Sequence, residues 1–344
     1  MNSRALTWWL ALLCVLAAAT PLPAWAAARS TKSPSERAPS TPAKARTSIA
    51  RDPYLGAIVI EAGSGQVLFE DQADAQGYPA SMLKLMDLLV VLEMVQYGRL
   101  SLQDTVTVSA RASKVGGSQV WLAEKEVFTV DELLYALMVQ SANDAALALA
   151  EKVAGTPEGF VELMNRRART LGMTNTVFRS VHGLPPGAGQ QHDVTTPRDF
   201  ARLCREVLRH PEALRYTSTR ERPFRANVPG KAVVMRTHNH LLGAVEGCDG
   251  LKTGYFSDAG YSLAATASRN GQRVVAVVLG STAWKVRDAK ATELIAKGFL
   301  ALSHLVVVQD DDGLHREPQR CRGGPTCSPV SRPQRGGSLP ANHE

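Results

Sequence analysis

The sequence lacks the ligand spacing that is typical of zinc sites. Its five cysteines and eight histidines include no C-x-x-C pair and no H-E-x-x-H motif, the arrangements that bring zinc ligands together on one turn or helix. We therefore expect no metal and no cofactor. Cys204 and Cys248 are either small core residues or the two halves of one disulfide, and Cys321 and Cys327 could close a short loop.

The sequence also has few aromatic residues, 6% of the chain, and no concentrated positive charge. Of the net charge of +7, residues 1–26 carry +1 and residues 27–50 carry +4, while residues 309–344 are balanced and residues 51–308 keep +2. A nucleic-acid-binding protein typically shows a basic stripe with interleaved aromatic residues. The composition therefore argues against nucleic acid as a partner.

The apolar run near the N-terminus is too short for a typical membrane span. It covers residues 5–19, about 15 residues, whereas a spanning helix needs about 20. Arg4 precedes the run, and Ala24-Trp25-Ala26 follows it with the small-x-small form of a signal-peptidase site. We expect residues 1–26 to be a signal peptide that directs export to the periplasm or cell envelope. The alternative is an uncleaved membrane anchor.

Two further segments lack the periodicity of packed structure. Residues 27–50 and 309–344 are rich in small and polar residues, proline and arginine, so they cannot bury enough apolar surface to offset their ordering entropy. We predict a disordered leader and a disordered polar tail. The folded domain is then residues 51–308.

Within this domain, strand patterns flank a helical middle. Residues 54–69 resemble two strands joined by a glycine-rich turn, and residues 81–98 form an apolar run with helical periodicity. A capping box at Thr129 and threonine-proline pairs at 156–157 and 196–197 predict three more helix starts.

The C-terminal part of the domain returns to strand-like alternation. Asn270-Gly271 joins two apolar strand patterns, which is a strong hairpin signal, and a last helix is expected over residues 284–302. The order of elements predicts an α+β (α/β) fold, with an antiparallel sheet flanked by helices and a helical subdomain.

Three short motifs stand in a fixed order along this domain. They are Ser81-Met82-Leu83-Lys84, Ser141-Ala142-Asn143 and Lys252-Thr253-Gly254. Each is weak alone, but the S-x-x-K, S-x-N and K-T-G set in this order is typical of β-lactamases and penicillin-binding proteins. The set predicts a serine acyl-enzyme hydrolase.

The first motif supplies a nucleophile and a base. Ser81 and Lys84 are three residues apart at the start of a helix, so their side chains lie on one side of it. A serine hydroxyl needs an adjacent base, and a lysine serves as one only if its pKa is lowered by burial or by a nearby cation. We expect Lys252 to be that cation.

The other two motifs supply proton transfer and substrate binding. We assign Ser141 to relay a proton to the leaving amine, and Asn143 to hydrogen-bond Lys84 and the substrate amide. Lys252-Thr253-Gly254 should begin a strand whose edge pairs with an extended peptide, with the Thr253 hydroxyl on the terminal carboxylate. The backbone N–H groups of Ser81 and Tyr255 are expected to form the oxyanion hole.

At these residues the chain resembles low-molecular-mass penicillin-binding proteins of the D-alanyl-D-alanine carboxypeptidase family, over about residues 52–302. The similar stretches are PASMLKLM, QSANDAALALAE, LGMTNTVF, VHGLP and LKTGYFSDAGYSLAATA. The resemblance implies a fold like that of β-lactamases and transpeptidases. It also implies a peptidoglycan pentapeptide ending in acyl-D-Ala-D-Ala as substrate, and β-lactam antibiotics as covalent inhibitors.

The resemblance also implies that Arg287 helps to bind the terminal carboxylate, although a plain surface arginine is the alternative. The chain departs from the family's usual pattern in three places. Asp87 stands where family members usually carry threonine, and Tyr255 where many carry histidine or phenylalanine. The family's second, β-rich domain and its C-terminal amphipathic membrane helix have no counterpart after residue 302, so no stable membrane anchor is expected.

Several activities remain open from the sequence. The first is a carboxypeptidase that removes the terminal D-alanine, and the second is an endopeptidase that cuts peptidoglycan cross-links. A β-lactamase would need a carboxylate to activate the deacylating water, and the nearest candidate, Glu162, falls in a regular helical pattern. A catalytically dead penicillin-binding or wall-binding module is the non-enzymatic alternative.

Overall fold

The computed structural model describes residues 48–228 and 230–314. The predicted signal peptide, most of the predicted leader, and Cys321 and Cys327 lie outside the described residues. Residues 48–50, the end of the predicted leader, contact the domain: the Ile49 N–H donates to the Asp258 carbonyl at 2.9 Å.

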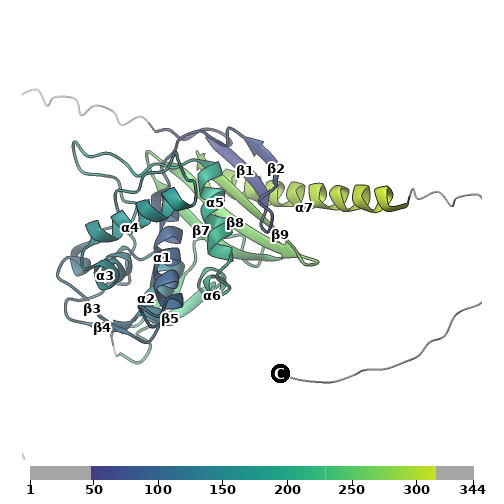
Figure 1. Ribbon diagram of the computed structural model, residues 1–344. Helices are drawn as coiled ribbons and strands as arrows, with labels where there is room; N and C mark the ends of the chain where they lie inside the picture. Colours follow the sequence, from purple (N-terminus) through teal and green to yellow (C-terminus); the bar gives the residue numbers. More distant parts are fainter. Residues whose placement is uncertain (1–47, 229, 315–344) are drawn as a thin grey trace, which may run out of the picture. The chain divides into compact units, whose positions relative to one another are not determined.

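A five-stranded antiparallel sheet forms the centre of the domain (Figure 1). Its strand order is β2-β1-β9-β8-β7. The strands are β1 (Gly56–Glu61), β2 (Val67–Asp71), β7 (Cys248–Phe256), β8 (Gly260–Arg269) and β9 (Gln272–Ser281). Strand β7 therefore lies at one edge of the sheet, where its outer side is open to another strand.

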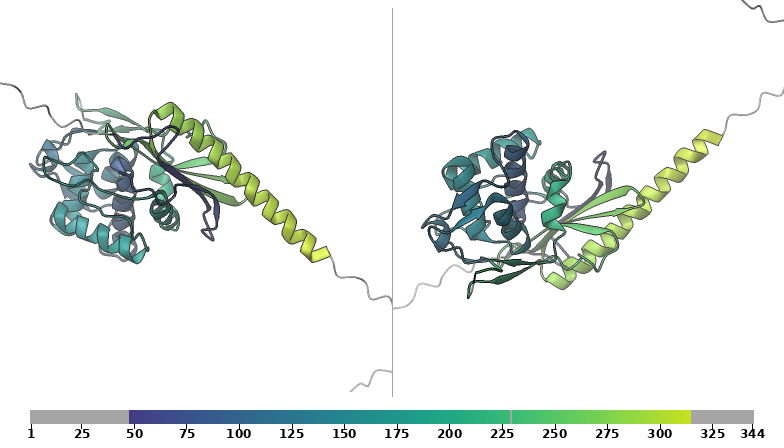
Figure 2. Two further views of the ribbon diagram at one scale, coloured as in Figure 1. Left: turned by 90° about the horizontal axis from the view of Figure 1, so that it is seen from above. Right: turned by 90° about the horizontal axis from the view of Figure 1, so that it is seen from below.

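Both faces of the sheet are covered by helices, as Figure 2 shows. Alternate residues of a strand point to opposite faces, so Val59 packs with Leu294 and Ile295 of α7 (Trp284–Leu314), whereas Ile58 packs with the helical part of the domain. The first turns of α7 thus cover one face, and α5 (Pro197–Leu208) lies on the other. The predicted antiparallel sheet flanked by helices is confirmed.

The helical part of the domain surrounds α1 (Lys84–Gln96), which follows a 3-10 turn at Ala80–Leu83. Residues 84–92 of α1 are all buried. The helices that pack against α1 include α2 (Val130–Val139), α3 (Asn143–Ala154), α4 (Pro157–Thr170) and α6 (Glu212–Thr217). This part of the domain also holds a 3-10 turn at Ala112–Lys114 and the short strand pairs β3 (Thr105–Thr107) with β4 (Val127–Thr129) and β5 (Glu221–Phe224) with β6 (Val233–Arg236).

The predicted helix starts are confirmed by the capping hydrogen bonds. Thr129 and Glu132 form a reciprocal capping box, and the Thr156 and Thr196 side chains each accept a backbone N–H at the start of α4 and α5. The last helix is longer than predicted: it continues to Leu314 instead of ending at Leu302. Neither glycine nor proline stands between Leu302 and Gly313 to end it.

The two cysteines within the described residues are free. Cys204 is buried in α5 and Cys248 is half-buried at the start of β7, so the alternative of a disulfide between them is wrong. Within the described residues, no helix combines the length and apolar character needed to cross a membrane.

Candidate active site

A cavity of about 450 Å³ brings the three motifs together. Six of the predicted site residues line it: Ser81, Ser141, Thr253, Gly254, Tyr255 and Arg287. The other three, Lys84, Asn143 and Lys252, are buried. Sequence reasoning missed five lining residues, Ser118, His238, His240, Tyr261 and Trp284.

The amine of Lys84 makes three polar contacts. Its Nζ lies 3.1 Å from Ser81 Oγ, 2.8 Å from Asn143 Oδ1 and 2.7 Å from the His182 carbonyl oxygen. The predicted contacts of Lys84 with Ser81 and Asn143 are therefore present. A neutral amine has two N–H groups and one lone pair, so it can donate to the amide and carbonyl oxygens while its lone pair accepts the Ser81 O–H.

Burial is the main influence on the pKa of this amine. Lys84 is 0% exposed, and burial lowers its pKa to about 8, although the charges of Asp87, Asp193 and Asp144 act in the opposite direction. The charge of Lys252, the predicted cause, is not among the causes of this shift. Lys252 is itself buried, and burial together with the charges of Lys84 and Arg287 holds its pKa well below the usual value.

The turn that carries Ser81 is held between two segments whose glycines allow close approach. A Cβ on Gly254 would lie 2.4 Å from the Pro79 carbonyl oxygen, and a Cβ on Gly183 would lie 2.2 Å from the Ala80 carbonyl oxygen. Gly183 also has a φ of +73°, which side-chain-bearing residues rarely adopt. The backbones of β7 and of the His182–Leu184 segment therefore fix the position of the Ser81 hydroxyl.

The Ser141 motif forms a break between α2 and α3. Ser141 has a φ of +60°, and the Asn143 N–H donates to the Ser118 carbonyl at 2.8 Å. The Asp144 carboxylate accepts the N–H groups of Val120 and Leu122. The break is thus tied to the loop that brings Ser118 into the cavity.

The Lys252-Thr253-Gly254 motif occupies residues five to seven of the nine-residue strand β7, not its beginning as predicted. The strand starts earlier because Cys248 and Gly250 pair with β8 across an irregularity in register, although aspartate and glycine in this stretch are weak strand formers. The prediction that the motif lies on a sheet edge is confirmed.

Arg287 is a buried residue of the cavity wall and not a surface arginine. Its side chain is 4% exposed, and its Nε donates to Asp288 Oδ1 at 2.8 Å. The other oxygen of Asp288 lies 2.8 Å from His240 Nδ1, and the His240 ring contacts the edge of Trp284. Asp288 thus holds both a guanidinium and an imidazole at this end of the cavity.

Among the described residues, no carboxylate lines the cavity. Glu162, the candidate base of the β-lactamase alternative, lies in the regular helix α4 and lines a different hollow. Within the described residues, the one group of three possible metal ligands is Glu93, Glu206 and His210. Arg167 pairs with both of its carboxylates, so their charges are already compensated, and the group lies apart from the cavity.

A glycine comparison tests the fixed position of the Ser81 turn. Gly183→Ala places a Cβ against the Ala80 carbonyl. Gly98 has a similar positive φ, but a Cβ added there would meet no atom of the described residues within 4 Å beyond its chain neighbours. Both changes strain the backbone, by about 1 kcal/mol. We expect Gly183→Ala to lose roughly 2 kcal/mol more on denaturant unfolding, and equal losses would contradict the close packing.

Asp87 provides a second test, because both of its carboxylate oxygens are buried and have no hydrogen-bond partner in the part of the chain that the structure describes. Burial raises its pKa well above 3.8. The protonated acid therefore stabilises the fold fully below pH about 4, and this contribution is lost as pH rises towards the raised pKa. The advantage of Asp87→Asn over wild type in unfolding free energy should grow between pH 4 and 8.

The control for this test is Glu293→Gln, which removes an exposed carboxylate from α7. Ion pairs with Lys290 and Lys297 lower the Glu293 pKa to about 2, so its loss should slightly destabilise the fold over the same pH range. If Asp87→Asn showed no pH-dependent gain, the carboxyl of Asp87 would not be protonated in the fold.

The sequence matches a known protein family and is similar to characterised proteins. The model of the family described as D-alanyl-D-alanine carboxypeptidase matches residues 46–283. D-alanyl-D-alanine carboxypeptidase DacF of Bacillus subtilis is 35% identical over 254 residues, 74% of this chain and 64% of that protein. DacC of Escherichia coli is 35% identical over 262 residues, with coverages of 74% and 63%. The chain thus spans a little under two thirds of these relatives.

Solved structures of related proteins have a similar fold. D-alanyl-D-alanine carboxypeptidase DacD of Francisella tularensis has a TM-score of 0.66 at 28% identity, covering 73% of this chain and 71% of that one. Ampicillin-bound penicillin-binding protein D2 of Listeria monocytogenes has a TM-score of 0.63 at 32% identity, covering 72% and 97%. The family model matches more than half of the chain, and the protein therefore belongs to the D-alanyl-D-alanine carboxypeptidase family.

Proposed function

We propose that the protein is a serine-type D-Ala-D-Ala carboxypeptidase that removes the terminal D-alanine from peptidoglycan stem peptides through an acyl-enzyme on Ser81. The observation that carries this proposal is the contact between the desolvated amine of Lys84 and the Ser81 hydroxyl. That contact lies at an open cavity with room for a peptide end.

In the proposed reaction, the neutral amine of Lys84 takes the Ser81 proton as Oγ attacks the carbonyl between the two D-alanines. The proton then passes through the Ser141 hydroxyl to the leaving amine, and free D-alanine departs. Water attacks the resulting ester, with Lys84 again as base, and Ser81 is restored. Asn143 keeps the amine in place through its 2.8 Å hydrogen bond and is proposed to contact the substrate amide.

The substrate is proposed to pair with the open edge of β7, where Gly254 lets the two backbones approach. Its terminal carboxylate then meets the Thr253 hydroxyl and the cationic side of the cavity. Arg287, which Asp288 holds in place, is proposed to donate a hydrogen bond to this carboxylate, and the arriving carboxylate favours the protonated form of Lys252. The backbone N–H groups of Ser81 and Tyr255 are proposed to hold the oxyanion.

β-Lactams are proposed to acylate the same serine. Penicillin-binding protein D2 of Listeria monocytogenes has been solved in ampicillin-bound and cefotaxime-bound forms, and this likeness supports the proposal. Peptidoglycan lies outside the cytoplasmic membrane, so the proposed substrate requires export to the periplasm or cell envelope, in agreement with the predicted signal peptide. No observation favours the endopeptidase alternative, and the intact Ser81–Lys84 contact argues against a catalytically dead module.

The proposal is tested with purified protein and two substrates. Wild type should release D-alanine from a diacyl tripeptide ending in D-Ala-D-Ala, and mass spectrometry should find penicilloyl adduct on Ser81. The matched control, Ser81→Ala, should do neither. Release of monomers from cross-linked muropeptides without D-alanine release would favour the endopeptidase, and absence of both adduct and release would overturn the proposal.

The rate of acylation should depend on pH through Lys84. The neutral amine is the base, and burial lowers its pKa to about 8, so about one tenth is neutral at pH 7. We expect the second-order acylation constant with a penicillin to rise about tenfold per pH unit below pH 8 and to level off above it. A constant that kept rising to pH 10 would contradict this account.

A further inference from the structure

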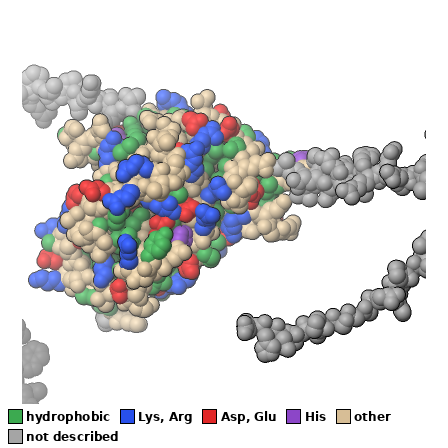
Figure 3. All heavy atoms as spheres, in the orientation of Figure 1, with side chains coloured by type: hydrophobic (Ala, Val, Ile, Leu, Met, Phe, Trp, Pro, Cys, Tyr) green, Lys and Arg blue, Asp and Glu red, His purple; other side chains and the backbone are tan. Residues whose placement is uncertain are grey.

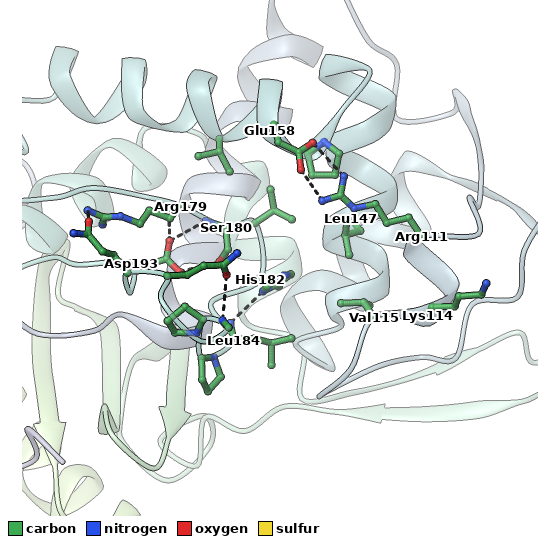
Figure 4. Close-up of a pocket in the computed structure, with 18 residues that line it drawn as sticks. Arg111, Lys114, Val115, Leu147, Glu158, Arg179, Ser180, His182, Leu184 and Asp193 are labelled. Atoms are coloured by element: carbon green, nitrogen blue, oxygen red, sulfur yellow. Dashed lines mark hydrogen bonds and ion pairs between the residues drawn. The ribbon is translucent and has the colours of Figure 1, made fainter. Parts of the chain in front are cut away.

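A second and larger cavity, of about 980 Å³, lies beside the active site. Its apolar floor is formed by Val115, Leu147, Val161, Val181 and Leu184. Charged side chains stand around this floor: Figure 4 shows the Arg111–Glu158 pair on one wall and Arg179 with Asp193 on the other. The proposed reaction uses none of these side chains.

The two cavities share a thin partition. On one side of it, the His182 carbonyl holds the Lys84 amine at 2.7 Å, while His182 and Leu184 also line the larger cavity. The facing part of the partition is the loop from Val115, which lines the larger cavity, to Ser118, which lines the active site. A Cβ on Gly117 would lie 2.6 Å from Asn143 Nδ2 and 2.9 Å from Leu184 Cδ2.

The direction of the proposed substrate leads towards this cavity. A peptide that pairs antiparallel with β7, with its terminal carboxylate at Thr253, must extend its upstream residues past Tyr255 towards Phe256. The Phe256 ring stacks on His192 at 5.4 Å between centroids. The chain neighbours of His192, Gln191 and Asp193, belong to the lining of the larger cavity.

The accessible charge in this cavity is positive. Arg111 and Glu158 neutralise each other at 2.6 Å, and buried Asp193 accepts the N–H groups of Arg179 and Ser180 and the Ser180 hydroxyl. Lys114 and Arg179 are exposed, and neither belongs to an ion pair within the described residues. Two exposed cations therefore remain for an anionic ligand. Burial raises the pKa of the nearby Asp193 carboxyl, and the charge of one of these cations, Arg179, acts in the opposite direction.

We propose that this cavity is a subsite for the acidic upstream part of the stem peptide, in which Lys114 and Arg179 contact carboxylates two or more residues before the scissile bond. This inference rests on the proposed function and extends it to substrate selection. The apolar floor of the cavity contacts the alkyl parts of these substrate residues. The two cations bind their carboxylates, so a full stem peptide binds more tightly than a short peptide without them.

The test compares three substrates that differ only upstream of D-Ala-D-Ala. They are a diacetyl-lysyl tripeptide, a pentapeptide with free glutamate and diaminopimelate carboxylates, and the same pentapeptide with those carboxylates amidated. Lys114→Gln and the double variant Lys114→Gln/Arg179→Gln should raise KM for the acidic pentapeptide, by roughly threefold for each charge removed. KM for the other two substrates and kcat for all three should stay unchanged.

Arg166→Gln is the matched control, because Arg166 is an exposed arginine of α4 that lines a different hollow. Lys114→Gln alone guards against a loop change in the double variant, since Arg179 also donates to the His192 carbonyl and to Gln191. Equal effects on all three substrates, or no effect on the acidic one, would overturn the subsite. Inactivity of wild type on the tripeptide would instead overturn the proposed function.

Discussion

The burial of one amine is the constraint on which the site depends. Lys84 opens a helix whose first nine residues are all buried, so water cannot solvate its charge and its proton is held weakly. The surrounding oxygens then determine what the neutral amine can do. Asn143 Oδ1 and the His182 carbonyl occupy its two N–H groups, which leaves the lone pair for the Ser81 hydroxyl.

The backbone around this amine is arranged to keep that geometry. β7 and the segment at Gly183 press on the Ser81 turn from separate parts of the chain, and the α2–α3 break is tied to the Ser118 loop by Asn143 and Asp144. Positioning of this kind contributes to catalysis because the reacting groups need no rearrangement when the substrate arrives. The site is therefore a product of the whole domain and not of three motifs alone.

The motifs, the sheet and most helix starts could be predicted because each leaves a local pattern. Ser81 and Lys84 are one turn apart, Thr129 begins a capping box, and Asn270-Gly271 marks a hairpin. The His182 carbonyl could not be predicted, since any residue supplies a carbonyl and only tertiary packing selects one. His238, His240 and Ser118 come from loops without periodicity. The burial of Lys252, which lowers its own pKa, could not be predicted either, because no local pattern marks it.

The protonation of Lys84 at neutral pH tests the central claim most directly. Lysine labelled with ¹³C at Cε can be titrated by NMR, with Lys84→Arg used to assign the signal. The account predicts a midpoint near pH 8, as burial requires. A midpoint near 10.5, the ordinary value for lysine, would leave only about one amine in three thousand neutral at pH 7, which is too few for Lys84 to act as the base.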